Sequence, residues 1–158
     1  MAAPSPTTRQ TPAGIVLPDG YQSLVTFATD PDVSVWEKGI TPPGIDGGEP
    51  IEQTTMHNAD WRTFAPRSLK TLTPHTFMCA YDPDAFNQLY ALVNVPTTVT
   101  VTFGDGSTLA FYGFLQKFEP AELVEGTQPE ATVTVVPTNY DHVNKVEAAP
   151  VLTSVAGT

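Results

Sequence analysis

The chain is short of basic residues, of charge in general and of cysteine. It has 158 residues, of which 7 are Lys or Arg and 17 are Asp or Glu, so its formal net charge is −10. Recognition of a nucleic-acid duplex needs a basic face. The composition therefore excludes a DNA-binding groove and predicts repulsion from phosphate groups. A single cysteine, Cys79, excludes an intrachain disulfide, and its apolar neighbours predict an inert, buried thiol.

Long apolar runs and export signals are also lacking. No stretch approaches the roughly 20 apolar residues that span a bilayer. Residues 1–6, Met-Ala-Ala-Pro-Ser-Pro, have neither the basic start nor the apolar run of a signal peptide. We therefore expect no membrane insertion, and assembly in the cytoplasm.

Catalytic and metal-binding patterns are equally scarce. His57, His75 and His142 are too far apart in sequence for metal-ligand spacing, and none pairs with a cysteine motif. The Gly104–Gly106 turn is followed by no Lys-Ser or Lys-Thr, so it is not a phosphate loop. We expect no enzyme, no cofactor and no metal. A small hydrolase would need two carboxylates in one cleft, and no pair among the acids is marked out for that role.

What the chain does contain is a strong β pattern between Pro96 and Pro137. Thr98–Phe103 and Ala131–Val136 alternate hydroxyl and apolar side chains, and Ser107–Phe118 forms a longer run between them. Period-two patterning with β-branched residues predicts half-buried strands, and Gly-Asp-Gly suits a hairpin turn. The sequence thus predicts a three-stranded antiparallel meander with one apolar face and one threonine-rich face.

The remaining elements are predicted from shorter signals. Residues 21–29 and 33–37 are expected to form an early hairpin, and 67–81 returns to strand. Asp82–Asn94 is expected to form the single helix, because Asp82 caps it and Pro83 suits its first turn. At helical spacing its apolar face would consist of Phe86, Leu89, Tyr90 and Val93.

Residues 39–66 form an unusually long connection, rich in Pro and Gly. Connections in compact domains have a median of roughly 4–6 residues, and long ones are usually functional or disordered. This one carries apolar side chains that disordered linkers lack, so we expect them to contact another subunit. An alternative is a loop folded back on its own domain. The expected contact residues are Ile45, Ile51, Met56, Trp61 and Phe64.

The expected organisation is one mainly β domain, an antiparallel β-sandwich or barrel-like fold flanked by one helix. The domain spans 19–140 and includes the assembly loop 39–66 and the helix 82–94. It lies between an N-terminal arm, 1–18, and a C-terminal arm, 141–158.

This order of elements resembles the major tail tube protein of long-tailed, siphovirus-type bacteriophages. The likeness covers residues 21–140 and is carried by their architecture and by segments such as Trp36–Gly44 and Thr97–Phe103. The resemblance implies a β-sandwich whose homohexameric rings stack into the hollow tail tube of the virion, assembled in the host cytoplasm. DNA would pass through without specific binding, and tape-measure, tail-tip and tail-terminator proteins would be partners.

An acidic tube wall would keep DNA from adhering in transit. The candidate lumen-facing acids are Asp105, Glu119, Glu122, Glu125 and Glu130. A different class of function stays open beside the tube. In it the chain is a monomeric β-sandwich binding module, a phage decoration or tail-tip domain or a carbohydrate-binding domain, with Trp36 and Trp61 as stacking platforms.

Overall fold

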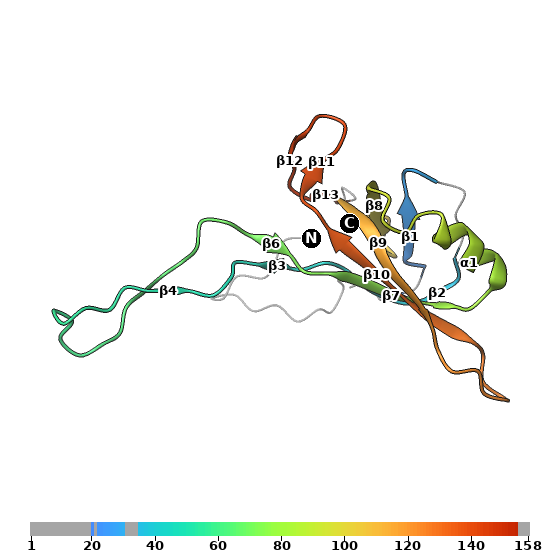
Figure 1. Ribbon diagram of the computed structural model, residues 1–158, viewed down its shortest axis with the longest axis horizontal. Coiled ribbons are helices and arrows are strands. Elements are labelled where there is room, and N and C mark those ends of the chain that lie inside the picture. Colours follow the sequence, from blue (N-terminus) through green and yellow to red (C-terminus); the bar gives the residue numbers. More distant parts are fainter. Residues whose placement is uncertain (1–19, 21, 31–34, 155–158) are drawn as a thin grey trace, which may run out of the picture.

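A computed structural model describes residues 20, 22–30 and 35–154, so the predicted arm 1–18 lies outside the described residues. The described part is mainly β with one helix, as predicted (Figure 1). A large antiparallel sheet has the strand order β1-β8-β9-β10-β7-β2, and β13 also pairs with β9. Its strands are β1 (Leu24–Phe27), β2 (Glu37–Thr41), β7 (His75–Ala80), β8 (Thr97–Thr102), β9 (Thr108–Pro120), β10 (Glu130–Pro137) and β13 (Val151–Thr153).

The sheet curls into a half-barrel that brings its two end strands together. The Val25 N–H of β1 donates a hydrogen bond of 3.0 Å to the Glu37 carboxylate of β2. The early hairpin predicted from residues 21–29 and 33–37 is therefore wrong, because β1 pairs with β8 and β2 pairs with β7. Long-range pairing has overridden the local pattern, and Val35 and Trp36 precede the second strand instead of belonging to it.

The meander β8-β9-β10 is confirmed close to its predicted bounds. Val99 and Val101 of β8, and Val133 and Val135 of β10, are completely buried, whereas the threonines between them are partly exposed. A register shift between Thr134 and Val135 adds one residue to β9 and bends this 13-residue strand. The threonine-rich face is thus the outer face of the curled sheet.

The core fills the concave side of the sheet. It is built from Phe27, Phe77 and Phe111 with the buried valines and leucines of the surrounding strands. Cys79 is fully buried among them. The predicted burial of this thiol is confirmed, and burial and the nearby Glu37 charge raise its pKa to about 11, which disfavours the reactive thiolate.

The helix α1 (Pro83–Tyr90) is shorter than the predicted 82–94. The Asp82 carboxylate caps it by accepting from the Asp84 N–H, as expected. At the other end Asn94 takes a φ of 60° and its N–H donates to the Leu115 carbonyl of β9. This bond to the sheet replaces the last helical turn. No helix in the described ranges is long and apolar enough to cross a bilayer.

The buried face of α1 also differs from the predicted one. Ala85, Leu89 and the following Leu92 enter the core, whereas Phe86 is 39% exposed and Tyr90 is 73% exposed. The prediction that Phe86 and Tyr90 lie on the core face is therefore wrong, because the small Ala85 leaves the phase of the apolar stripe ambiguous in the sequence.

Residues 140–154 are more regular than the C-terminal arm predicted for 141–158, of which 155–158 lie outside the described residues. β11 (Tyr140–Asp141) and β12 (Val146–Glu147) form a small hairpin, and β13 then joins the main sheet. The Asp141 carboxylate accepts from the Val143 and Asn144 N–H groups and from the Tyr112 hydroxyl of β9. These contacts tie the hairpin to the sheet. Strands of two or three residues give no readable period, which is why the sequence did not indicate them.

His75 is the one polar side chain in the described core that is both fully buried and titratable near neutral pH. Its ring lies between Phe77 and Phe111, with ring centroids 5.7 Å and 5.8 Å away. Its Nδ1 contacts the Thr41 carbonyl oxygen at 2.6 Å, and its Nε2 has no hydrogen-bond partner. Burial therefore lowers the pKa of His75, because protonation would place a charge in the core.

We expect this histidine to make the free energy of unfolding depend on pH below neutrality. The unfolded chain binds a proton near the ordinary pKa of about 6.5, and the folded chain does so only at lower pH. The contribution of His75 to the free energy of unfolding is therefore fully present above about pH 6.5. It is lost as the pH falls from there towards the lowered pKa of the folded state, by at most about 1.4 kcal/mol per pH unit. Urea unfolding between pH 7 and 5 measures the slope. The variant His75→Phe keeps an aromatic ring and should flatten it, and an unchanged slope would contradict this assignment.

Candidate assembly surfaces

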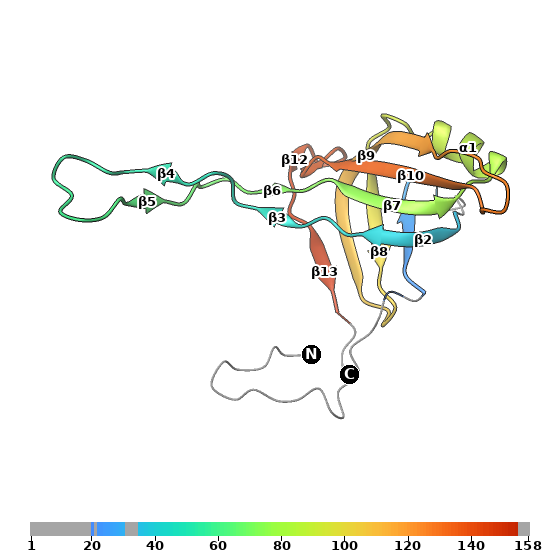
Figure 2. The ribbon, with the colours of Figure 1, turned by 90° about the horizontal axis from the view of Figure 1, so that it is seen from below.

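The long connection is a two-stranded ribbon that extends the β2–β7 pair away from the sheet (Figure 2). Its paired segments are β3 (Ile45–Asp46) with β6 (Thr71–Leu72), and β4 (Ile51–Glu52) with β5 (Phe64–Ala65). The excursion therefore runs to Leu72 rather than to Pro66. Within the segment 67–81 that was predicted to return to strand, the strands are Thr71–Leu72 and His75–Ala80. The outgoing arm from Thr41 to Thr55 can span up to about 46 Å at roughly 3.3 Å per residue.

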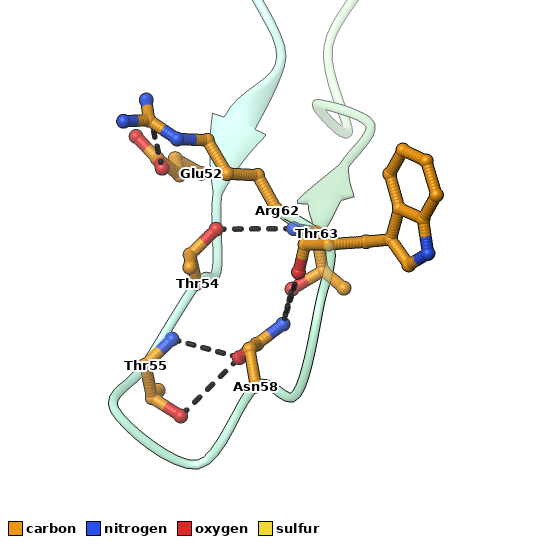
Figure 3. Close-up of polar contacts among 7 residues, drawn as sticks. Glu52, Thr54, Thr55, Asn58, Arg62 and Thr63 are labelled. Atoms are coloured by element: carbon orange, nitrogen blue, oxygen red, sulfur yellow. Dashed lines mark hydrogen bonds and ion pairs between the residues drawn. The ribbon is translucent and has the colours of Figure 1, made fainter.

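The tip of the ribbon is held by its own polar groups (Figure 3). The Asn58 side chain accepts from the Thr55 N–H at 2.9 Å and donates to the Trp61 carbonyl at 2.8 Å. The Thr63 N–H donates to the Thr54 hydroxyl at 3.0 Å. These bonds connect the two arms across the turn, so the tip has a defined shape before any partner binds.

The five predicted contact residues are all exposed, and they are spread along the ribbon. Met56 and Trp61 lie at the tip and are 101% and 82% exposed. Ile51 and Phe64 lie on the middle pair of strands, and Ile45 lies at the root. The ribbon thus presents apolar side chains that are 45% to 101% exposed, and it holds Met56 and Trp61 at its tip away from their own domain.

A groove of about 710 Å³ lies at the root of the ribbon, between it and the segment around the β11–β12 hairpin. Sequence reasoning missed it, because its two walls are about 70 residues apart in the chain and neither carries a motif. Leu69 on one wall is 81% exposed. The lining residues are Ile45, Ser68, Leu69, Lys70, Thr71, Leu72, Asn139, Glu147, Ala148, Ala149 and Pro150.

The predicted acidic residues fall into two groups at different ends of β9. Glu119, Glu122, Glu125 and Glu130 gather at the β9–β10 hairpin, whereas Asp105 lies in the β8–β9 turn. The 13 residues of β9 separate the two groups by up to about 40 Å. Within the hairpin group, Glu130 pairs with Lys38, and Glu119 lies 3.8 Å from Lys117. Glu122 and Glu125 form no ion pair with a basic side chain in the described part of the chain.

A cluster of aromatic rings packs where α1 crosses the sheet. Phe86 meets Phe118 edge-on at 5.6 Å, and Tyr81 stacks on Phe118 at 6.3 Å. The rings of Phe86 and Tyr90 stack with centroids 6.3 Å apart. These contacts hold the helix on the sheet and account for the two aromatic residues that the core excludes.

Among the described residues, no group of three or more His, Cys, Asp or Glu side chains could hold a metal ion. The features that stand out are therefore surfaces for association: an apolar ribbon, a groove at its root and an acidic hairpin.

Comparison with known proteins finds likeness in structure only. No protein-family model matches the sequence, and no curated protein sequence matches it. A chain from the six-fold symmetrised baseplate of the anti-feeding prophage is 8% identical, with a TM-score of 0.58 over 85% of this chain and 92% of that chain. A chain from the C6-symmetric tail of an empty GTA particle is 10% identical, with a TM-score of 0.47 over 73% and 83%. The first likeness shows that this chain shares its fold with a chain of a prophage baseplate.

Proposed function

We propose that the chain is a structural subunit of a phage-type tail. Six copies would form a ring, and the rings would stack into a hollow tube that conducts DNA from the capsid to the host cell. The observation that carries this proposal is the ribbon, which holds Trp61 and Met56 exposed at its tip, far from its own core. Large apolar side chains displayed in this way mark an interaction surface. The fold likeness to a chain of a six-fold baseplate favours self-assembly of that kind.

The edges of the sheet support the same use. An unpaired strand edge exposes backbone N–H and C=O groups and invites pairing with another chain. Among the described strands, β13 pairs with β9 alone and carries the exposed Val151 and Leu152. A neighbouring subunit that extends the sheet would satisfy such an edge around a ring.

The charge of the chain suits a conduit for DNA. A net charge of −10 per copy, repeated around a ring, gives a strongly negative assembly. Glu122 and Glu125 at the hairpin, or Asp105 at the opposite turn, would face the bore if the threonine-rich outer face lined it. Tape-measure, tail-tip and tail-terminator proteins would complete the tail, and the tail would be assembled in the host cytoplasm.

Electron microscopy of the purified protein tests the proposal. We expect rings or tubes, with sedimentation coefficients that rise with concentration. A particle that stays monomeric at millimolar concentration would contradict it. Quenching of tryptophan fluorescence by glycans, without any association, would instead support the carbohydrate-binding module, since Trp36 and Trp61 are 68% and 82% exposed.

A further inference from the structure

We infer that the groove at the ribbon root is the receptor for the ribbon tip of a second copy of this chain. The inference rests on the proposed stacking and names the two surfaces that meet in it. Met56 and Trp61 of one copy would enter the groove of the next, against Ile45, Leu69 and Pro150.

The tip cannot reach the groove of its own chain. The groove lies at the root of the ribbon and the tip at its far end, separated by an extended paired arm of up to about 46 Å (Figure 2). The β3–β6 and β4–β5 pairs hold the two arms of the ribbon side by side and oppose folding the tip back. Because the ribbon tip and the groove are held apart on one molecule, the tip of one copy can contact the groove of the next only in a heterologous interface. Such an interface repeats head to tail into an open stack.

The reach of the ribbon is of the same order as the size of the domain. The arm from Thr41 to Thr55 spans up to about 46 Å, and β9, the longest strand of the sheet with 13 residues, spans up to about 40 Å. A second copy displaced along the ribbon by the length of the ribbon would bring its own ribbon root to the tip of the first. The repeat of the stack would be set by the length of the ribbon.

The charges beside the two surfaces are complementary. Asp60 and Arg62 flank Trp61 at the tip, while Lys70 and Glu147 line the groove. An Asp60–Lys70 pair across the contact would fix its orientation and disfavour the reversed one. Arg62 lies 3.7 Å from Glu52 on its own ribbon and would exchange that carboxylate for Glu147 in the contact. The opposite end of the molecule is the competing receptor, because Leu123 and Val124 are exposed on the acidic hairpin. The two lysines beside that hairpin, Lys38 and Lys117, already face Glu130 and Glu119, so a contact with Asp60 there would have to displace one of these carboxylates.

Two single variants and their mixture test the inference. Trp61→Ala removes the largest apolar side chain of the ribbon tip and leaves the groove unchanged. Ala149→Trp fills the groove and leaves the ribbon tip unchanged. Each alone should fail to stack, with a dissociation constant per contact raised at least about 30-fold, the change that a 2 kcal/mol hot spot represents. When the two variants are mixed one to one, they should form pairs but not longer stacks. Only the ribbon tip of Ala149→Trp and the groove of Trp61→Ala are intact, so only one contact can form. Analytical ultracentrifugation and electron microscopy measure both results.

The control variant changes the acidic hairpin and leaves the groove and the ribbon tip unchanged. Leu123→Glu alters the competing hairpin surface and should stack as the unmodified chain does, and thermal melting confirms that every variant is folded. Normal stacking by Ala149→Trp, or no pairs in the mixture, would overturn the groove as the receptor while leaving tail assembly in place. Failure of the unmodified chain to associate at all would overturn the proposed function together with this inference.

Discussion

Replacing residues 47–70 by Asn-Gly is expected to leave the curled sheet folded and to abolish stacking completely. Asp46 and Thr71 are partners in the β3–β6 register, so the shortened chain can close between them. Two-residue Asn-Gly connections form the type I′ turn that suits a hairpin. The excised segment contains no buried residue, so its removal takes little apolar surface from the core.

The expected change in unfolding free energy is small, within about 1 kcal/mol, since surface substitutions away from special features usually alter it by about 0.5 kcal/mol. For a domain of this size, 1 kcal/mol moves the melting temperature by about 2–4 °C. Calorimetry checks the fold, and electron microscopy checks the stacks. If the shortened variant melts far below the unmodified chain, the ribbon contributes to the stability of the sheet and this prediction is wrong.

A smaller cut separates the tip from the arm. Glu52 and Phe64 are also register partners, so residues 53–63 can be replaced by Asn-Gly with β4 and β5 kept. This variant loses Met56 and Trp61 but keeps the groove at the root. If the tip is the contacting part, both cuts abolish stacking alike. Normal stacks from the smaller cut would assign the contact to the arm.

The parts of the fold that sequence predicted are those with local signals. Alternation in Thr98–Phe103 and Ala131–Val136 fixes which side chains face the core, because a slip of one residue would expose Val99 and Val133. The Gly-Asp-Gly turn then joins neighbours in sequence, with Gly106 at a φ of 91°. The cap at Asp82 is likewise a local bond, and it lies where predicted.

The parts that sequence could not predict depend on distant partners. Nothing in residues 24–27 says that they pair with 99–102, or that Val151 finds Ala110. The ribbon was recognised as an excursion from its apolar residues, but its two-residue strands among Pro and Gly carry no period. The groove needs two walls that only the tertiary fold brings together.

Substitution of Gly113 by alanine is expected to destabilise the whole sheet by about 3 kcal/mol. Gly113 lies where β9 passes from β8 to β10, and it is the register partner of both Thr97 and Pro137. A Cβ at this position would lie 2.7 Å from the Val136 carbonyl oxygen and 3.3 Å from its carbonyl carbon. Both are backbone atoms, so no side-chain rotation relieves the contact and β10 itself must move.

Moving β10 disturbs β7 as well, because the two strands are paired from Glu130 to Val135. Overpacking in a core costs about 1–3 kcal/mol, and the backbone clash places Gly113→Ala at the upper end. The melting temperature should then fall by about 6–12 °C. Gly39→Ala in β2 is the matched control, because a Cβ there meets nothing within 4 Å. Equal melting temperatures for the two variants would contradict this prediction. They would show that β9 and β10 can move apart at Gly113 without a loss of stability.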